Sequence, residues 1–262
     1  MSDASTMTRD RFAPSAFRLD GSLAVVTGAS RGIGRGCARA LAAAGADVAL
    51  VARTRSDLES AADEIMALGR VAHIIVCDVT NLDSASAALA SLPRLDVVIN
   101  NAGGNIPLPF LEVTQRNYES LFDLNMKAPF FFTQAAVRRM IDLGTPGSIV
   151  NISSQAGHVA LRDRSVYCAT KHALEGFTKA IAIELAPLGI RANTVAPTFI
   201  ESKMTESFFR ESKFAAYVRE RIPMGRIGTV DDVVGAVLYL ASPASALVTG
   251  TSLRVDGGWT AQ

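Results

Sequence analysis

The residues of this chain best suited to chemistry are a tyrosine and a lysine four positions apart. Tyr167 and Lys171 lie in the segment SVYCATK, and at this spacing two side chains share one face of a helix. A nearby ammonium favours the phenolate, so we expect the pKa of Tyr167 to fall toward neutrality. Such a phenol could give a proton to a carbonyl oxygen or take one back. On its own, such a pair is common by chance and is more typical of an ordinary helix surface.

A serine hydroxyl precedes this pair at the end of an apolar run. Ser154 comes thirteen residues before Tyr167 and just after the segment 148–152, which has the composition of a buried strand. Ligands of α/β proteins bind at the carboxyl ends of strands. A hydroxyl there could hydrogen-bond an oxygen on which charge develops during a reaction.

A glycine-rich turn near the start of the chain predicts a dinucleotide site. The apolar run 23–27 leads into GASRGIG, and a helical pattern follows. Glycines allow a tight turn, and the helix N-terminus then presents N–H groups to a pyrophosphate. The alternative is a tight turn that binds nothing. The residues of this turn that we expect to contact the cofactor are Gly28, Ser30, Arg31, Gly32, Ile33 and Gly34.

The end of the next apolar run indicates which dinucleotide binds. NAD sites usually have an acidic residue there, whereas an arginine accommodates the extra phosphate of NADP. This chain has Arg53, and Arg31 could serve as a second clamp. The sequence therefore favours NADP(H) over NAD(H). The alternative is that both arginines are solvated surface residues.

The elements that must position these residues alternate between short apolar runs and longer helical stretches. We expect strands at 23–27, 47–52, 72–77, 96–100, 148–152, 191–196 and 252–255. We expect helices at 33–44, 54–68, 84–92, 115–143, 165–188 and 230–240. This alternation predicts the α/β class: a single-domain, doubly wound, Rossmann-like parallel sheet of about seven strands with helices on both faces.

Composition, net charge and cysteine spacing limit the partners and metal sites that this chain could have. The chain has 262 residues, 49% of them hydrophobic, and a net charge of +1, which gives no argument for nucleic acid or a membrane as partner. Its three cysteines show neither metal-ligand nor disulfide spacing, so we expect no metal site and a cytoplasmic protein. We expect a flexible tail at 1–19, one domain at 20–262, and a substrate lid at 197–223.

Several motifs occur together in the order and at the intervals of a known family. With the glycine turn, the segments NNAG (100–103), NISS (151–154) and SVYCATK resemble the short-chain dehydrogenases/reductases over about residues 20–260. The resemblance implies a catalytic triad of Ser154, Tyr167 and Lys171. It also implies that Asn125 holds a water for proton relay and that Lys171 bonds the nicotinamide ribose. The interval to Tyr167 selects Ser154 over Ser153.

The resemblance also implies further cofactor contacts and an assembly. Asp78 and Val79 would meet the adenine, and Asn101, Ala102 and Gly103 would line the adenosine side. The nicotinamide amide would meet the segment 197–202, where the family usually has glycine in place of Thr198; the residues are Pro197, Thr198, Ile200 and Ser202. The family is mostly tetrameric, so we expect a homotetramer.

The expected function is an NADP(H)-dependent oxidoreductase that moves a hydride between nicotinamide and a carbonyl or secondary alcohol. Short segments such as FLEVT and RIPMGR are similar to L-xylulose/dicarbonyl reductases and to sugar or polyol dehydrogenases, which favours a small polar ketone, sugar or polyol. The alternatives are a 3-oxoacyl-(acyl-carrier-protein) reductase and a non-catalytic NADP(H)-binding regulator. Arg164 is either a contact for a polar or anionic substrate or part of a surface salt bridge.

Overall fold

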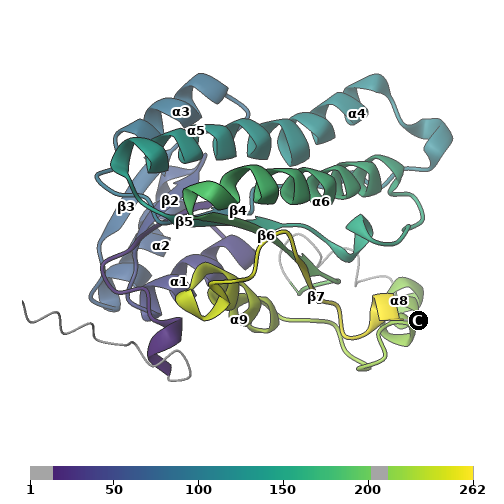
Figure 1. The fold of residues 1–262 in the computed structure, drawn as a ribbon. Coiled ribbons are helices and arrows are strands. Elements are labelled where there is room, and N and C mark those ends of the chain that lie inside the picture. The colour runs from purple at the N-terminus through teal and green to yellow at the C-terminus, as the bar shows by residue number, and fades with distance from the viewer. Residues whose placement is uncertain (1–13, 202–211, 262) are drawn as a thin grey trace, which may run out of the picture.

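Parallel pairing joins the apolar runs into one central sheet. Within residues 14–201 and 212–261, which the computed structural model describes, seven parallel strands pair in the order β3-β2-β1-β4-β5-β6-β7 (Figure 1). They are β1 (Leu23–Thr27), β2 (Asp47–Ala52), β3 (Ala72–Val76), β4 (Val97–Asn100), β5 (Gly147–Ile152), β6 (Ile190–Pro197) and β7 (Ser252–Val255). The predicted fold is confirmed. The order reverses between β1 and β4, and such a switch point leaves a crevice at the carboxyl ends of the strands.

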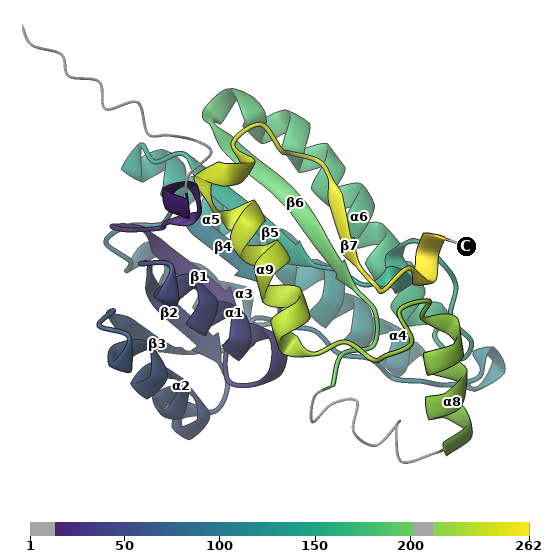
Figure 2. The same cartoon turned by 90° about the horizontal axis from the view of Figure 1, so that it is seen from below.

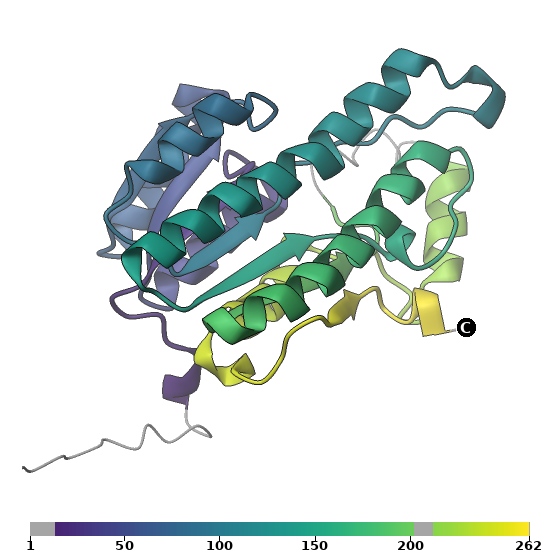
Figure 3. The same cartoon turned by 45° about the horizontal axis from the view of Figure 1, so that its top comes forward.

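Helices cover both faces of this sheet. Figure 2 shows α1 (Gly32–Ala43), α2 (Arg55–Ala67) and α9 (Val230–Ala241) on one face. Figure 3 turns the other face toward the viewer, and this face carries α3 (Leu82–Ala90), α4 (Gln115–Phe122), α5 (Ala128–Leu143) and α6 (Ser165–Leu185). In the described chain, no helix is long and apolar enough to cross a membrane.

Each face of the sheet has its own hydrophobic core. All five residues of β1 are buried, because alternate side chains face alternate helical layers. Val26 packs with Leu41 and Leu58 on the α1 and α2 side, whereas Val25 packs with Phe132 on the α5 side. Apolar area removed from water on both faces stabilises the strands that end at the crevice.

The helical stretch predicted at 115–143 is interrupted in the structure. A π-helical turn, Asp123–Lys127, separates α4 from α5. Pro129 explains the interruption, because proline has no N–H to donate to the carbonyl of Asn125, four residues before it. Helical periodicity continues across the break, so the apolar pattern does not reveal it. The turn places Asn125 on the side of the helix that faces the crevice loops.

The predicted tail and the predicted lid each contain a short helix that buries an apolar side chain. Residues 14–19, assigned to a flexible tail, include a 3-10 helix (Pro14–Phe17) and bury the apolar side chains of Ala16 and Leu19. The tail prediction is therefore wrong for these residues. Within the predicted lid, α8 (Ser212–Arg221) buries Val218 beside Trp259. Residues 202–211, including Ser202, lie outside the described residues.

A core substitution tests the layer between α5 and the sheet. Phe132 is 2% exposed, and we predict that Phe132→Ala lowers the free energy of unfolding by about 3–5 kcal/mol because the lost ring leaves a cavity. Phe110→Ala, at a ring that is 75% exposed, is the matched control and should cost less than about 0.5 kcal/mol. Urea unfolding at one protein concentration measures both. Equal losses in the two variants would contradict the prediction.

Candidate active site

A cleft of about 830 Å³ lies at the carboxyl ends of the strands. Its lining brings together nearly every residue that we predicted for the site. The predicted residues that line it are Gly28, Ser30, Arg31, Gly32, Ile33, Arg53, Asp78, Val79, Asn101, Ala102, Gly103, Ser154, Tyr167, Lys171, Pro197, Thr198 and Ile200. Gly34 and Asn125 lie behind this lining, and Ser202 is outside the described residues.

The glycine turn at one end of the cleft depends on close backbone packing. Gly28 and Gly32 have φ angles of 66° and 55°, in the left-handed region that favours glycine. At Gly34 a Cβ atom would collide with the Gly28 carbonyl oxygen and with the side-chain nitrogen of Asn101. Arg31, at the N-cap of α1, makes no capping hydrogen bond with its side chain. The first amides of α1 therefore face the cleft without a side-chain cap, as a phosphate site requires.

Asn101 and Thr27 hold the two sides of the switch point together. The Asn101 side chain donates to the carbonyl oxygens of Thr27 and Gly28, at 2.9 and 3.3 Å. The Thr27 hydroxyl accepts the backbone N–H groups of Asn101 and Ala102, each at 3.0 Å. Asn101 is therefore also a clamp between β1 and the loop after β4. The contribution of Thr27 was missed, although its place directly before the glycine turn is a usable signal.

Positive charge lines the nucleotide end of the cleft. The Arg53 side chain is 77% exposed, and its nearest nitrogen is 4.0 Å from the Asp78 carboxylate. An exposed pair at this separation contributes little to stability, so the guanidinium is available to a ligand. Hydrogen bonds from the backbone and the hydroxyl of Thr80 hold the pKa of Asp78 below its ordinary value.

Tyr167, Lys171 and Ser154 meet at the other end. Tyr167 and Lys171 lie on the same face of α6, with the Lys171 nitrogen 5.7 Å from the centre of the Tyr167 ring. The Lys171 ammonium donates to the carbonyl oxygen of Ile152 at 2.9 Å. Ser154 hydrogen-bonds the Tyr167 side chain, and its oxygen accepts the Ala156 N–H at 3.1 Å. This arrangement leaves the Ser154 hydrogen to donate toward Tyr167 or toward an oxygen beside it.

The expected low pKa of Tyr167 is wrong for this structure. Burial raises the pKa of Tyr167, because an apolar environment disfavours the phenolate, and the hydrogen bond from Ser154 only opposes this effect. Burial also lowers the pKa of Lys171 to about 8, although the neighbouring Glu175 carboxylate acts in the other direction. The phenol is therefore protonated at neutral pH, which suits a proton donor.

Asn125 acts on the site through its neighbours. It is buried in the π-helical turn, where its side chain donates to the Gly104 carbonyl at 2.9 Å and to the Thr170 hydroxyl at 3.2 Å. Its side-chain oxygen accepts the Gly104 N–H at 2.9 Å. Asn125 thus ties the loop after β4 to α6, one residue before Lys171. In this structure the amide positions that loop, and its contribution to a water relay stays a prediction.

A buried polar ladder under the site was also missed. The Asn100 amide donates to the Thr133 hydroxyl at 2.8 Å and to the Asn151 side-chain oxygen at 2.7 Å. The Asn151 amide donates in turn to the Thr178 hydroxyl at 2.8 Å. These contacts join β4 and β5 to α5 and α6 at fixed positions, because hydrogen bonds between buried side chains have narrow geometry. The asparagines at the strand ends were a signal, but their partners are distant in sequence.

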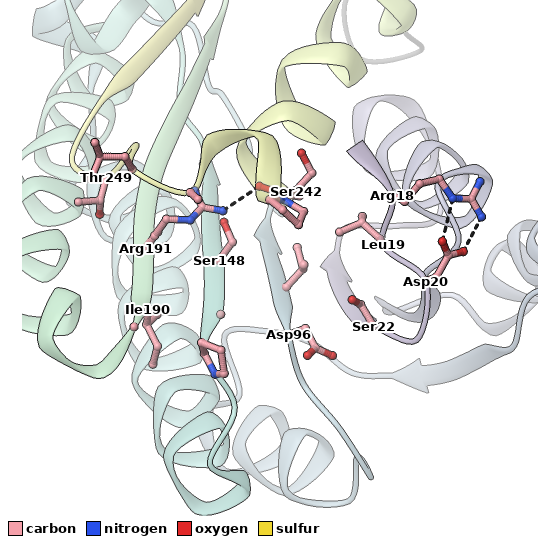
Figure 4. Close-up of a pocket in the computed structure, with 18 of the residues that line it drawn as sticks. Arg18, Leu19, Asp20, Ser22, Asp96, Ser148, Ile190, Arg191, Ser242 and Thr249 are labelled. Carbon is pink, nitrogen blue, oxygen red and sulfur yellow. Dashed lines mark hydrogen bonds and ion pairs between the residues drawn. The ribbon is translucent and has the colours of Figure 1, made fainter. Parts of the chain in front are cut away.

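A second cavity, of about 680 Å³, lies at the amino ends of the strands (Figure 4). None of the predicted site residues lines it. Its charged groups bind one another or the backbone: Arg18 pairs with Asp20, and Arg191 donates to the carbonyl oxygens of Leu240 and Ser242 at 2.8 and 3.3 Å. These contacts serve the fold, because they join the strands to the segment after α9.

Comparisons with known proteins agree with this geometry. Residues 28–260 match a family model described as Enoyl-(Acyl carrier protein) reductase. D-erythrulose reductase of Gallus gallus is 43% identical over 239 residues, covering 91% of this chain and 96% of that protein. L-xylulose reductase of Mesocricetus auratus is 42% identical over 241 residues, covering 92% and 97%.

Solved structures are similar to this chain over nearly its whole length. A short-chain type dehydrogenase/reductase from Mycobacterium marinum has a TM-score of 0.90 and 38% identity, covering 95% of this chain and 99% of that one. A gluconate 5-dehydrogenase from Burkholderia cenocepacia J2315, in complex with NADP and tartrate, has a TM-score of 0.91 and 35% identity, covering 95% and 98%. This chain belongs to the short-chain dehydrogenase/reductase family.

Proposed function

We propose that this protein is an NADP(H)-dependent oxidoreductase that interconverts a carbonyl and a secondary alcohol on a small polar ketone, sugar or polyol. The observation that carries the proposal is the set of residues that the cleft at the carboxyl ends of the strands brings together. A phosphate-binding turn lies at one end, and a protonated phenol, a serine hydroxyl and a lysine lie at the other. The erythrulose and xylulose reductases named above support the choice of a sugar-like substrate.

The cleft fits a nicotinamide dinucleotide phosphate. The first amides of α1 would bind the pyrophosphate, and Arg53 and Arg31 would bind the additional phosphate. At the nicotinamide end, the Thr198 hydroxyl is buried with no hydrogen-bond partner among the described residues, and a carboxamide would supply one. The bound NADP of the gluconate 5-dehydrogenase supports this assignment.

The catalytic residues act on the oxygen of the reacting group. The bound cofactor supplies or accepts the hydride. Ser154 and Tyr167 hydrogen-bond the substrate oxygen, and Tyr167 gives it a proton as negative charge develops there. Lys171, anchored on the Ile152 carbonyl, stabilises the phenolate that this transfer leaves. Asn125 keeps the loop after β4 and the adjacent turn of α6 in the positions that this contact requires.

We also propose a homotetramer working in the cytoplasm. An exposed aromatic cluster supports a subunit contact on the outer face of α5 and α6: Phe130 packs against Phe131 and Phe177, with ring centres 5.1 and 4.9 Å apart. The rings of Phe130 and Phe131 are partly exposed, as they would be before burial by another subunit. The free thiols of Cys37, Cys77 and Cys168 suit a reducing compartment.

Tyr167→Phe tests the proton donor. Removing the hydroxyl should lower kcat for carbonyl reduction by at least about 100-fold, because no other group would protonate the oxygen at this position. NADPH should still bind, which quenching of protein fluorescence can measure. Tyr118→Phe is the matched control, since that ring is exposed on α4, and it should retain activity. Activity near the wild-type level in Tyr167→Phe would refute the mechanism.

Arg53→Asp tests the choice of cofactor. The change should raise the KM for NADPH by about 10- to 100-fold through loss of a charge-assisted phosphate contact, while the KM for NADH changes little or falls. Arg116→Asp makes the same charge change at an exposed position outside the cleft and should leave both constants near wild type. If Arg53→Asp changed the KM values for NADPH and NADH equally, Arg53 would not be the residue that binds the additional phosphate.

The pH dependence of the two directions should differ. Lys171 is charged below about pH 8 and neutral above it, so kcat/KM for reduction should be level below pH 8 and fall at higher pH. Alcohol oxidation needs an unprotonated phenol, and because the pKa of Tyr167 is raised, its rate should keep increasing on the alkaline side. Steady-state rates in both directions across this range measure the two profiles. A reduction rate that stays level well above pH 8 would count against the assigned pKa of Lys171.

A further inference from the structure

A buried carboxylate lies about one helical turn beyond the catalytic lysine. Glu175 comes four residues after Lys171 on α6, so the two side chains share one face of the helix. Glu175 is 5% exposed and Lys171 is 6% exposed. Burial favours the neutral form of a titratable group unless an opposite charge or hydrogen bonds support the charged form. Two opposite charges on one face of α6 can therefore support each other.

Groups of the sheet fix the position of the Glu175 carboxylate. The Thr194 hydroxyl on β6 donates to the carboxylate and lies 2.9 and 3.1 Å from its two oxygens. The Ser252 hydroxyl on β7 donates to one of these oxygens at 3.2 Å. Gly157, in the turn after β5, packs so closely that a Cβ atom there would lie 3.0 Å from Cγ of Glu175. The carboxylate is thus held in place from three separate elements.

The Lys171 ammonium is supported by a carbonyl oxygen and by this carboxylate. It donates to the Ile152 carbonyl at 2.9 Å. Among the described residues, Glu175 is the charged side chain whose field acts on Lys171. Burial lowers the pKa of Lys171 to about 8, and Glu175 opposes this fall. The charged form of Lys171 therefore depends on the negative charge of Glu175.

The other elements around Lys171 bring no second carboxylate to it in the described chain. Tyr167 is on the same helix, with its ring centre 5.7 Å from the ammonium. The π-helical turn meets α6 through Asn125, which is neutral. The helix α4 also packs on α6, but its charged residues Arg116 and Glu119 are exposed and are not among the groups that act on Lys171.

One further titratable side chain faces Glu175. His158, in the loop after β5, has its Nε2 atom 3.4 Å from the carboxylate and 2.9 Å from the Ser252 hydroxyl. The groups that meet Glu175 from β6 and β7 are hydroxyls and carry no charge. Within the part of the chain that the structure describes, the basic groups near Glu175 are thus Lys171 and His158.

We propose that Glu175 is a positioning residue of the active site, whose carboxylate holds Lys171 in its charged form. Glu175 does not line the cleft, so it acts on the reaction through Lys171 and not by contact with substrate or cofactor. Without its charge, Lys171 would lose its proton at a lower pH, and the phenolate formed at Tyr167 would then lack a counter-charge. The effect on turnover rests on the proposed oxidoreductase function, whereas the effect on Lys171 does not.

The protonation of Lys171 can be measured without turnover. The chain has few lysines, so enzyme labelled with carbon-13 at lysine Cε gives few proton–carbon NMR signals, and the one that Lys171→Arg removes belongs to Lys171. In the wild type, this signal should titrate with a midpoint near pH 8. Glu175→Gln keeps the shape of the side chain and removes its charge, so the midpoint should fall by about half a pH unit or more.

A charge-conserving variant separates this role from a structural one. Glu175→Asp keeps the charge but shortens the side chain, so its midpoint should stay closer to the wild type than that of Glu175→Gln. A purely structural role would give the opposite order, because glutamine preserves the shape. Glu175→Met is a second neutral variant of similar length, so the result does not depend on the folding of Glu175→Gln. A cooperative thermal transition shows that each variant is folded.

Glu184→Gln is the matched control, because it makes the same change at an exposed position of the same helix. His158→Gln changes the other titratable neighbour and leaves the carboxylate in place. Both variants should keep the Lys171 midpoint near its wild-type value. The proposal is overturned if neither Glu175→Gln nor Glu175→Met lowers the midpoint, or if Glu175→Asp lowers it as far as Glu175→Gln does.

Turnover distinguishes failure of this proposal from failure of the proposed function. In reduction of a neutral ketose with NADPH, the alkaline fall in kcat/KM should begin at a lower pH in Glu175→Gln, by the same interval as the Lys171 midpoint. An active Glu175→Gln enzyme with the wild-type profile overturns the role of Glu175 and leaves the oxidoreductase. A lowered Lys171 midpoint in a protein whose wild type reduces no carbonyl compound leaves the role of Glu175 and overturns the proposed function.

Discussion

The close approach of two backbone segments at the switch point is the constraint on which the site depends. The glycine turn after β1 can pack against the loop after β4 only because Gly34 has no side chain. The Thr27 hydroxyl and the Asn101 amide then form hydrogen bonds with the backbone groups that this close approach buries. Without it, the first turn of α1 would not face the ends of β4 and β5. The phosphate site and the catalytic hydroxyls would then no longer share a cleft.

Polar contacts, more than apolar ones, determine where the catalytic helix lies. Apolar packing against a sheet tolerates small shifts, whereas buried hydrogen bonds have narrow geometry. The ladder from Asn100 through Asn151 to Thr178 fixes α6 against β5, and Asn125 fixes the second turn of α6 through Thr170. Lys171 adds a direct bond to the end of β5. The position of Tyr167 therefore follows from contacts spread over four elements.

Local patterns explain what the sequence could predict. Apolar runs such as Val48–Val51 are buried on both faces, so their composition indicates strands of a covered parallel sheet, and the motif spacing locates the cleft. The break at Asp123–Lys127 was not predicted, because the helical pattern continues through it. The pKa of Tyr167 was predicted in the wrong direction, because the spacing to Lys171 is a local property. Burial of the phenol depends on the whole fold.

Arg164 is a second residue whose chemical properties depend on the whole fold and not on the local sequence. Neither its burial nor the left-handed backbone at Asp163 is encoded in a short segment, so the sequence alone could not separate a substrate contact from a surface pair. In the folded protein, its charge acts to lower the pKa of Tyr167, against the effect of burial.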